Sequence, residues 1–186
     1  MTELIEYYKG IFTILSSCAS RQLEEVTFRR TVIPVQELLD AAGKYFKKLM
    51  KNRPERIELE IEPMEAKVIG DVNQLRFLLE NLIDEALTVR EDGVIRLQAR
   101  QDNEYIRFLF TDTRREKSVE ELNQLFYPNL ARMTSGEKGE LRGTEYLVCK
   151  QIIRDHDEFA GCRGCRINAE PAEGGGFTVY FTIPRR

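Results

Sequence analysis

The sequence lacks the features that mark a membrane-spanning or secreted protein. No apolar run approaches the roughly 20 residues that a transmembrane helix needs, and no signal peptide opens the chain. The four cysteines show no spacing typical of a disulfide framework, which favours a reducing compartment. We therefore expect a cytoplasmic protein, and if it belongs to a membrane-bound sensor, we expect the membrane segments to lie outside this chain.

The sequence also lacks a strong excess of basic or acidic residues. The 28 lysines and arginines nearly balance the 31 aspartates and glutamates, so the net charge is −3. This balance argues against a nucleic-acid partner and against direct contact with an anionic membrane. Hydrophobic residues make up 42% and charged residues 32% of the 186 residues, which is typical of a soluble globular domain plus an appendage.

One stretch, residues 71–87, carries a strong helical pattern. Its apolar residues recur at three- and four-residue steps: Val72, Leu75, Leu79, Leu82 and Ala86. Asp71 stands after Gly70 at the position of an N-cap. Asn81 and Glu85 are four residues apart and share a face beside the apolar stripe, where a polar side chain needs a partner or a ligand. The periodicity alone is also compatible with two solvated surface residues.

The rest of the sequence contains apolar patterns typical of helices and of strands, in irregular order. They predict helices over 36–50, 118–126 and 145–155, and strands over 57–61, 66–69, 94–99, 105–111, 166–170 and 177–183. Ser118 and Glu121 are spaced as a capping box. Because helices and strands do not alternate strictly, we expect an α+β two-layer sandwich rather than a doubly wound sheet.

The N-terminal segment, residues 2–29, is predicted to form a helix with a heptad-like stripe. The stripe is broad: Leu4, Ile5, Tyr8, Ile11, Phe12, Leu15, Cys18, Ala19 and Val26. Such a stripe favours a helical bundle with more than one partner helix, and the alternative is a helix that packs back on its own domain. We expect residues 1–30 to form a separate N-terminal helix and residues 31–186 to form one domain.

The segment NLIDEAL, residues 81–87, resembles the N-box of sensor histidine kinase ATP-binding domains, a branch of the family that includes gyrase, Hsp90 and MutL. The family pattern is close to N-L-L-x-N-A, and Asn81, Leu82, Ile83 and Ala86 match it. Glu85 replaces the second asparagine, which holds magnesium in that family. A carboxylate can also ligate magnesium through oxygen, so Glu85 is the candidate metal ligand.

Later motifs extend the resemblance over roughly residues 32–184. Asp112 stands where the family has the aspartate that receives the adenine amino group, and Thr113 follows it. The glycines of the family motif D-x-G-x-G are replaced by Arg114 and Glu116. The segment LFYP before a polar loop is similar to the family's phenylalanine box and ATP lid, and GGGFTVYFTIP is similar to its last strand.

The second glycine box is also incomplete. The family pattern G-x-G-L reads here as Gly143, Thr144, Glu145 and Tyr146. Glycines in these boxes let the backbone take positive φ and approach phosphate closely, which arginine and glutamate cannot do. The resemblance thus implies a mixed sheet covered by helices on one face and no catalytic residue in this chain. It also implies a nucleotide site, either functional or vestigial, at Asn81, Glu85, Asp112, Thr113 and Gly143.

Two functional hypotheses follow from this resemblance. The first is a degenerate domain of a sensor histidine kinase in two-component signalling, which binds no cofactor and acts as an interaction module. Its partners would be a second copy, through the N-terminal helix, and other signalling domains. The second is a divergent domain that still binds Mg-ATP and phosphorylates a histidine outside this chain.

The only histidine, His156, lies past the second glycine box, and we interpret it as structural. Together with three cysteines it could also form a Cys₃His zinc set: Cys149, Cys162, Cys165 and His156. Cys149 falls on the apolar face of its predicted helix, so the four side chains are not expected to converge. A tight turn that carries two reduced thiols is the simpler interpretation of Cys162 and Cys165.

Overall fold

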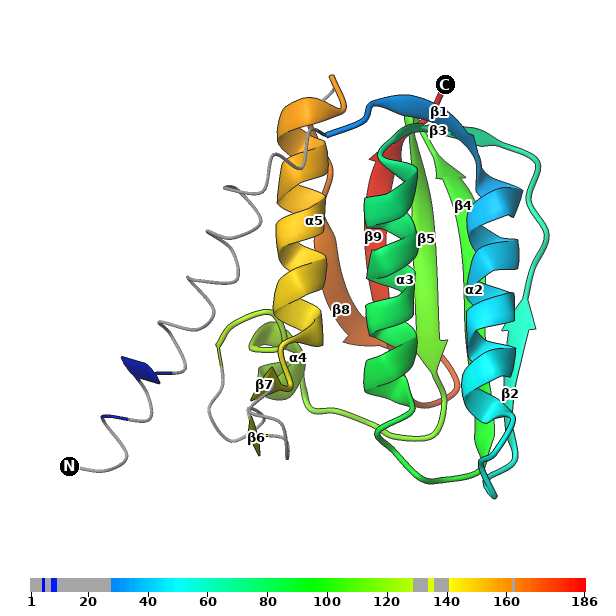
Figure 1. Cartoon of the computed structure of the whole chain (residues 1–186), viewed down its shortest axis with the longest axis vertical. Coiled ribbons are helices and arrows are strands. Elements are labelled where there is room, and N and C mark those ends of the chain that lie inside the picture. The colour runs from blue at the N-terminus through cyan, green and yellow to red at the C-terminus, as the bar shows by residue number, and fades with distance from the viewer. Residues whose placement is uncertain (1–4, 6–7, 10–27, 129–133, 136–140, 162) are drawn as a thin grey trace.

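Residues 5, 8–9, 28–128, 134–135, 141–161 and 163–186 are described by the structure, a computed structural model. Figure 1 shows two layers, in which three helices cover one face of a sheet. The helices are α2 (Val35–Met50), α3 (Val72–Ala86) and α5 (Glu145–Phe159). The α+β two-layer prediction is confirmed.

The main sheet is mixed and has the strand order β2-β4-β5-β9-β8. Its strands are β2 (Ile57–Ile61), β4 (Gly93–Asp102), β5 (Tyr105–Asp112), β8 (Ile167–Pro171) and β9 (Phe177–Pro184). Only the β2–β4 pair is parallel among these neighbours. β4 and β5 form a hairpin, with Asn103 at positive φ in its turn. The start of β4 and the end of β5 lie side by side in this sheet, next to the C-terminal end of α3.

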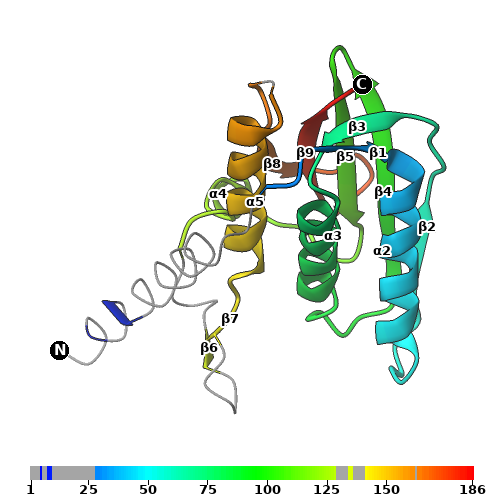
Figure 2. The ribbon, with the colours of Figure 1, turned by 45° about the horizontal axis from the view of Figure 1, so that its top comes forward.

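Shorter elements lie around these two layers. Figures 1 and 2 place β1 (Thr31–Pro34) and β3 (Lys67–Gly70), which pair antiparallel, at the end of the molecule where α3 begins. The short helix α4 (Val119–Asn123) precedes β6 (Thr134–Ser135) and β7 (Leu141–Arg142). The strand predicted over residues 66–69 therefore exists, but it belongs to the small sheet and not to the main one.

The core lies between the helices and the main sheet. Helix α3 buries most of its apolar side chains: Leu75, Leu78, Leu79, Leu82 and Ile83 are at most 1% exposed. From the sheet, Phe108 of β5 and Phe181 of β9 stack with their ring centroids 4.8 Å apart. Burying a large apolar side chain stabilises a fold by roughly 1.5–3 kcal/mol, so α3 is held mainly by this contact with the sheet.

Two helix starts were predicted correctly. The Asp71 side chain accepts hydrogen bonds from the backbone N–H groups of Asn73 and Gln74, which makes it the N-cap of α3. Ser118 and Glu121 form the capping box that precedes α4.

Two helix ends differ from prediction. Helix α4 ends at Asn123, because the chain then tightens into turns in which the Leu125 N–H bonds the Leu122 carbonyl. Helix α5 continues beyond 155 to Phe159, and Gly161 follows its C-cap at a φ of 88°.

The predicted N-terminal helix falls almost wholly outside the described residues, and so do Cys162 and most of the polar loop 129–143. Ile5 and Tyr8 are described as helical, and they are 51% and 63% exposed. The prediction that this helix forms a dimer therefore stays a prediction. Within the described part of the chain, no helix has the length and apolar content to cross a membrane.

Candidate nucleotide site

Helix α3 supplies the two N-box residues of the candidate site. Asn81 is 7% exposed, and its Nδ2 donates to the Phe77 carbonyl at 2.7 Å, one turn earlier in the same helix. Glu85 follows one turn later and is half-buried. Because part of the Asn81 amide is bonded to its own helix, it has less hydrogen-bonding capacity for a ligand.

Asp112 ends β5 and is 4% exposed. Both of its carboxylate oxygens accept from Arg114, with Nε to Oδ1 and Nη2 to Oδ2 each at 2.8 Å. The backbone N–H of Arg114 also donates to Oδ1 at 3.0 Å. The two side chains are 5% and 1% exposed, so this is a buried bidentate ion pair.

Arg114 also binds the backbone at the end of α3 and in the segment that follows it. Its Nη2 donates to the Ala86 carbonyl at 2.5 Å, and its Nη1 donates to the carbonyls of Val89 and Glu91 at 3.1 and 3.2 Å. Together with the ion pair, these bonds use all five N–H donors of the guanidinium. Gly93, at a φ of 146°, leaves room for this side chain, since a Cβ there would lie 2.6 Å from the Arg114 Cγ.

The other two predicted site residues belong to different parts of the fold, Thr113 to the end of β5 and Gly143 to the start of α5. Thr113 is fastened to β4, because its backbone N–H and its hydroxyl both donate to the Val94 carbonyl, at 3.2 and 2.7 Å. Gly143 has a φ of 85° and comes just before α5, whose N-cap Thr144 makes no side-chain capping bond. The structure therefore brings Asp112 and Thr113 to the end of α3, with Gly143 at the start of the neighbouring helix.

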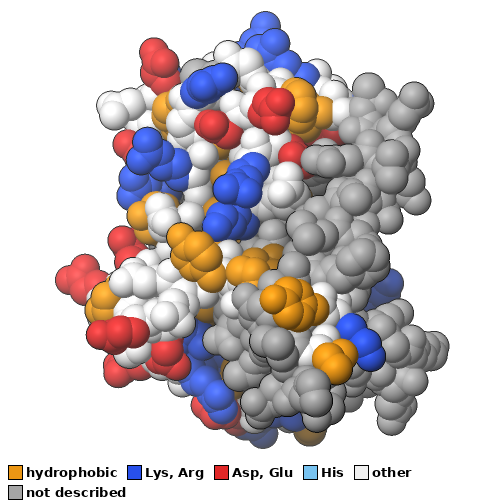
Figure 3. Space-filling model, turned by 90° about the vertical axis from the view of Figure 1, so that its left-hand side faces the viewer, with side chains coloured by type: hydrophobic (Ala, Val, Ile, Leu, Met, Phe, Trp, Pro, Cys, Tyr) orange, Lys and Arg blue, Asp and Glu red, His pale blue; other side chains and the backbone are white. Residues whose placement is uncertain are grey.

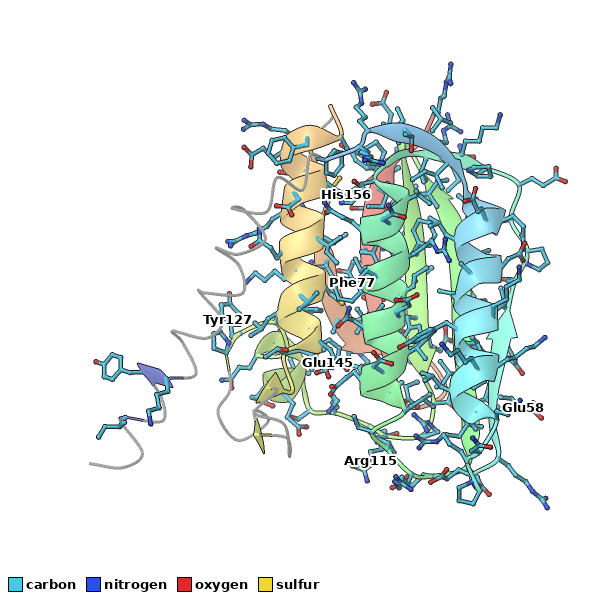
Figure 4. The ribbon with its side chains drawn as sticks, in the orientation of Figure 1. Glu58, Phe77, Arg115, Tyr127, Glu145 and His156 are labelled. Carbon is cyan, nitrogen blue, oxygen red and sulfur yellow. The ribbon has the colours of Figure 1, made fainter. Side chains whose placement is uncertain are left out.

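The surface between the last turns of α3 and the first turn of α5 is acidic. Burial raises the pKa of Asp84, and repulsion from Glu145 adds to this, while the hydrogen bond from Tyr45 at 2.7 Å acts in the opposite direction. Figure 4 shows Glu145 at the start of α5 beside α3, and its Oε2 is buried without a hydrogen-bond partner among the described residues. Burial, followed by the hydrogen bond to Asp84, raises the pKa of Tyr45 far above its usual value, so Tyr45 is a neutral donor.

No group of three or more His, Cys, Asp or Glu side chains within the described ranges could hold a metal ion.

Comparison with known proteins identifies the family. The family model described as "Histidine kinase-, DNA gyrase B-, and HSP90-like ATPase" matches residues 70–186. The chain belongs to this family. A search of curated proteins found no match.

The chain shares its fold with solved structures of histidine kinase catalytic domains. The mycobacterial sensor histidine kinase MprB is 18% identical, with a TM-score of 0.65 over 85% of this chain and 99% of that one. The catalytic domain of histidine kinase ThkA is 21% identical, with a TM-score of 0.64 over 84% and 97%. ThkA in complex with the response regulator protein TrrA is 18% identical, with a TM-score of 0.68 over 98% and 49%.

Within this histidine kinase-like ATPase fold, the part of the site that sequence reasoning missed is Arg114. The sequence identified it only as the replacement of a glycine, whereas its side chain occupies the space between Asp112 and the end of α3. The signal that could have found it is an arginine two residues after a buried strand-end aspartate, a spacing that allows a bidentate pair. Arg114 thus bonds both carboxylate oxygens of Asp112, the side chain to which the family resemblance assigns the adenine amino group.

His156 is buried with an exposure of 0%, and both of its ring nitrogens are bonded. Nδ1 lies 2.8 Å from the Ile152 carbonyl and therefore carries the proton, while Nε2 accepts from the Asp71 backbone N–H at 3.1 Å. These bonds favour the interpretation of His156 as structural. They leave no ring nitrogen for zinc, so the Cys₃His set loses its histidine.

We expect the stability of the protein to fall in mild acid because of His156. Burial lowers the pKa of His156 from 6.5, while the Ile152 hydrogen bond and the Asp71 charge act in the opposite direction. Below pH 6.5 the unfolded chain binds a proton that the folded protein excludes, so the free energy of unfolding decreases as the pH falls and is retained above this range.

The slope is at most about 1.4 kcal/mol per pH unit. Urea unfolding from about pH 5 to 8 should show this slope in the wild type and a flatter one in His156→Gln, which we expect to be less stable at the alkaline end. Equal slopes in the two proteins would contradict the assignment.

Proposed function

We propose that this chain is the ATP-binding-type domain of a sensor histidine kinase and that its nucleotide site is closed. The observation that carries the proposal is the Arg114 guanidinium, which neutralises Asp112 and uses all five of its donors inside the protein. An adenine amino group would have to displace this arginine from a buried ion pair. Such a displacement would leave both charges without their partner, which is costly in a buried site.

The phosphate side of the site supports the same proposal. Glu85, Asp84 and Glu145 place negative charge where the family resemblance puts the triphosphate and its magnesium ion. Two like charges about 4 Å apart repel by about 4 kcal/mol at the effective dielectric constant typical near a protein surface. A triphosphate would meet this repulsion without the glycine-rich backbone that normally offsets it.

A closed site fits a role as an interaction module in two-component signalling, on the cytoplasmic side. Aromatic side chains support such a role, since Phe77, Tyr127 and Phe159 are 40%, 59% and 50% exposed. Figure 3 shows hydrophobic side chains among charged ones on the side of the molecule that includes α5. The crystal structure of ThkA in complex with TrrA suggests a response regulator as one class of partner. The broad N-terminal stripe suggests a second copy as another.

Calorimetric and thermal-shift titrations with Mg-ATP and Mg-ADP test this proposal. We expect no binding heat and no change in melting temperature. A ligand present at 100 times its Kd would stabilise the folded state by about 2.7 kcal/mol. Nucleotide that binds with micromolar affinity would therefore raise the melting temperature measurably at sub-millimolar concentration.

The variant Glu85→Asn, which restores the family's magnesium ligand, should also show no binding, because Arg114 still fills the adenine side of the site. A nucleotide-binding histidine kinase catalytic domain, titrated in parallel, provides the positive control. Micromolar binding to the wild type would refute the closed site. It would favour the second hypothesis, an active domain that phosphorylates a histidine outside this chain.

A further inference from the structure

Residues 28–30, called the connector below, join the N-terminal segment to the domain. Each of them contacts residues at the C-terminal end of α5 or at the start of α3. The Phe28 ring meets the His156 ring edge-on, with centroids 4.8 Å apart, and lies 5.7 Å from the Phe159 ring. The Arg29 backbone N–H donates to Asp71 Oδ2 at 2.9 Å. These contacts place the connector against the domain before β1 starts at Thr31.

Arg30 makes the third attachment. Its guanidinium lies against Gly161, just past the C-terminal end of α5, where a Cβ would come within 2.8 Å of Nη2. A positive charge is favourable at this end of a helix, because the last carbonyl groups carry partial negative charge. Gly161 also adopts a φ of 88°, which a residue with a side chain rarely takes. The end of α5 is therefore shaped to receive Arg30.

Asp71 joins this connector to α3. One of its oxygens, Oδ1, caps the helix by accepting from Asn73 and Gln74, while the other accepts from Arg29. The backbone N–H of Asp71 donates to His156, which Phe28 covers. One buried residue thus receives the connector, starts the N-box helix and contacts the end of α5.

We propose that residues 28–30 act as a latch that couples the position of the N-terminal segment to the first turn of α3. When the latch is closed, Phe28 shields His156 from water and Asp71 is held from both sides. When the latch opens, water reaches His156, the bond from the Asp71 N–H weakens, and the α3 cap loosens. The latch does not depend on whether the nucleotide site is closed.

Substitutions at Asp71 separate the latch from the cap. Asparagine caps helices as well as aspartate does, but its Nδ2 would present a donor to the Arg29 N–H where Oδ2 accepts now. Asp71→Asn should therefore open the connector but keep a capping oxygen on α3, so that the cap loosens only through the open latch, whereas Asp71→Ala should open the connector and remove the cap itself. The rate of trypsin cleavage after Arg29 or Arg30 measures how often the connector detaches from the domain. The hydrogen-exchange rate of the Asn73 and Gln74 amides measures how often the α3 cap opens.

We expect cleavage after Arg29 or Arg30 to speed up in both Asp71 variants, and exchange of the Asn73 and Gln74 amides to speed up moderately in Asp71→Asn and more strongly in Asp71→Ala, which also loses the capping oxygen. The variant Phe28→Ala tests the coupling. It should accelerate hydrogen exchange of the Asn73 and Gln74 amides by about fivefold, which corresponds to the free energy lost when a typical N-cap is removed. Its matched control is Phe159→Ala, which removes the other ring beside Phe28 and leaves the contact with His156 intact.

Two results would overturn the latch. One is amide exchange in Phe28→Ala that equals that of the wild type or of Phe159→Ala, since residues 28–30 would then be tethered without coupling to α3. The other is an unchanged cleavage rate in Asp71→Asn. Neither measurement uses nucleotide, so a failure of the latch is distinct from a failure of the closed site.

Discussion

Replacing Arg114 with alanine should destabilise the protein by about 3–5 kcal/mol, the usual cost of removing one partner of a buried ion pair. The variant would leave Asp112 buried at 4% exposure without its counter-charge. It would also remove the donors that bind the carbonyls of Ala86, Val89 and Glu91 beyond α3. Urea unfolding followed by circular dichroism measures the difference in the free energy of unfolding.

The neighbouring Arg115 provides a matched control. It pairs with Glu91 at 2.8 Å, but the two side chains are 56% and 48% exposed. An exposed pair contributes about 0–1 kcal/mol, so Arg115→Ala should be nearly neutral. A double variant, Arg114→Met with Asp112→Leu, should recover part of the loss, because it removes the unpaired charge along with its partner.

Equal stability of Arg114→Ala and Arg115→Ala would contradict the buried pair. The guanidinium would then not be held in the site, and the main support for the closed site would be lost.

The fold could be predicted from the sequence because its signals are local. The apolar period of residues 71–87, with Asp71 before it, predicts α3, which runs from Val72 to Ala86. The turn at Asp102 and Asn103 predicts the β4–β5 hairpin. Each of these signals lies within one element or one turn, where spacing alone decides which residues share a face.

The state of the site could not be predicted, because it depends on contacts between distant parts of the chain. Arg114 is adjacent to Asp112 in sequence, but its other acceptors belong to the segment after α3. Sequence spacing gives no distance between that segment and the end of β5. The same holds for His156, whose partner Asp71 starts a different helix.

We expect the N-terminal helix to make this protein a two-fold dimer. Its predicted stripe begins with Ile5 and Tyr8, which are 51% and 63% exposed. Burying each large apolar side chain is worth roughly 1.5–3 kcal/mol, and a continuous exposed patch of this kind marks an interface. The domain has a core of its own within residues 28–186, so it does not need the stripe for folding. A second copy of the same helix is the partner that such a stripe fits, since most homo-oligomers are symmetric dimers.

The double variant Phe12→Asp with Leu15→Asp places two charges on this stripe and should give a monomer whose domain remains folded. Light scattering measures the mass, and the melting temperature of the domain checks that the fold is retained. Thr13→Asp with Ser17→Asp adds the same charge away from the stripe and should leave the dimer intact, because those positions face solvent in the predicted heptad. A wild-type protein that is monomeric at high concentration would refute the dimer. Dissociation of both variants alike would instead point to added charge, and not to the stripe, as the cause.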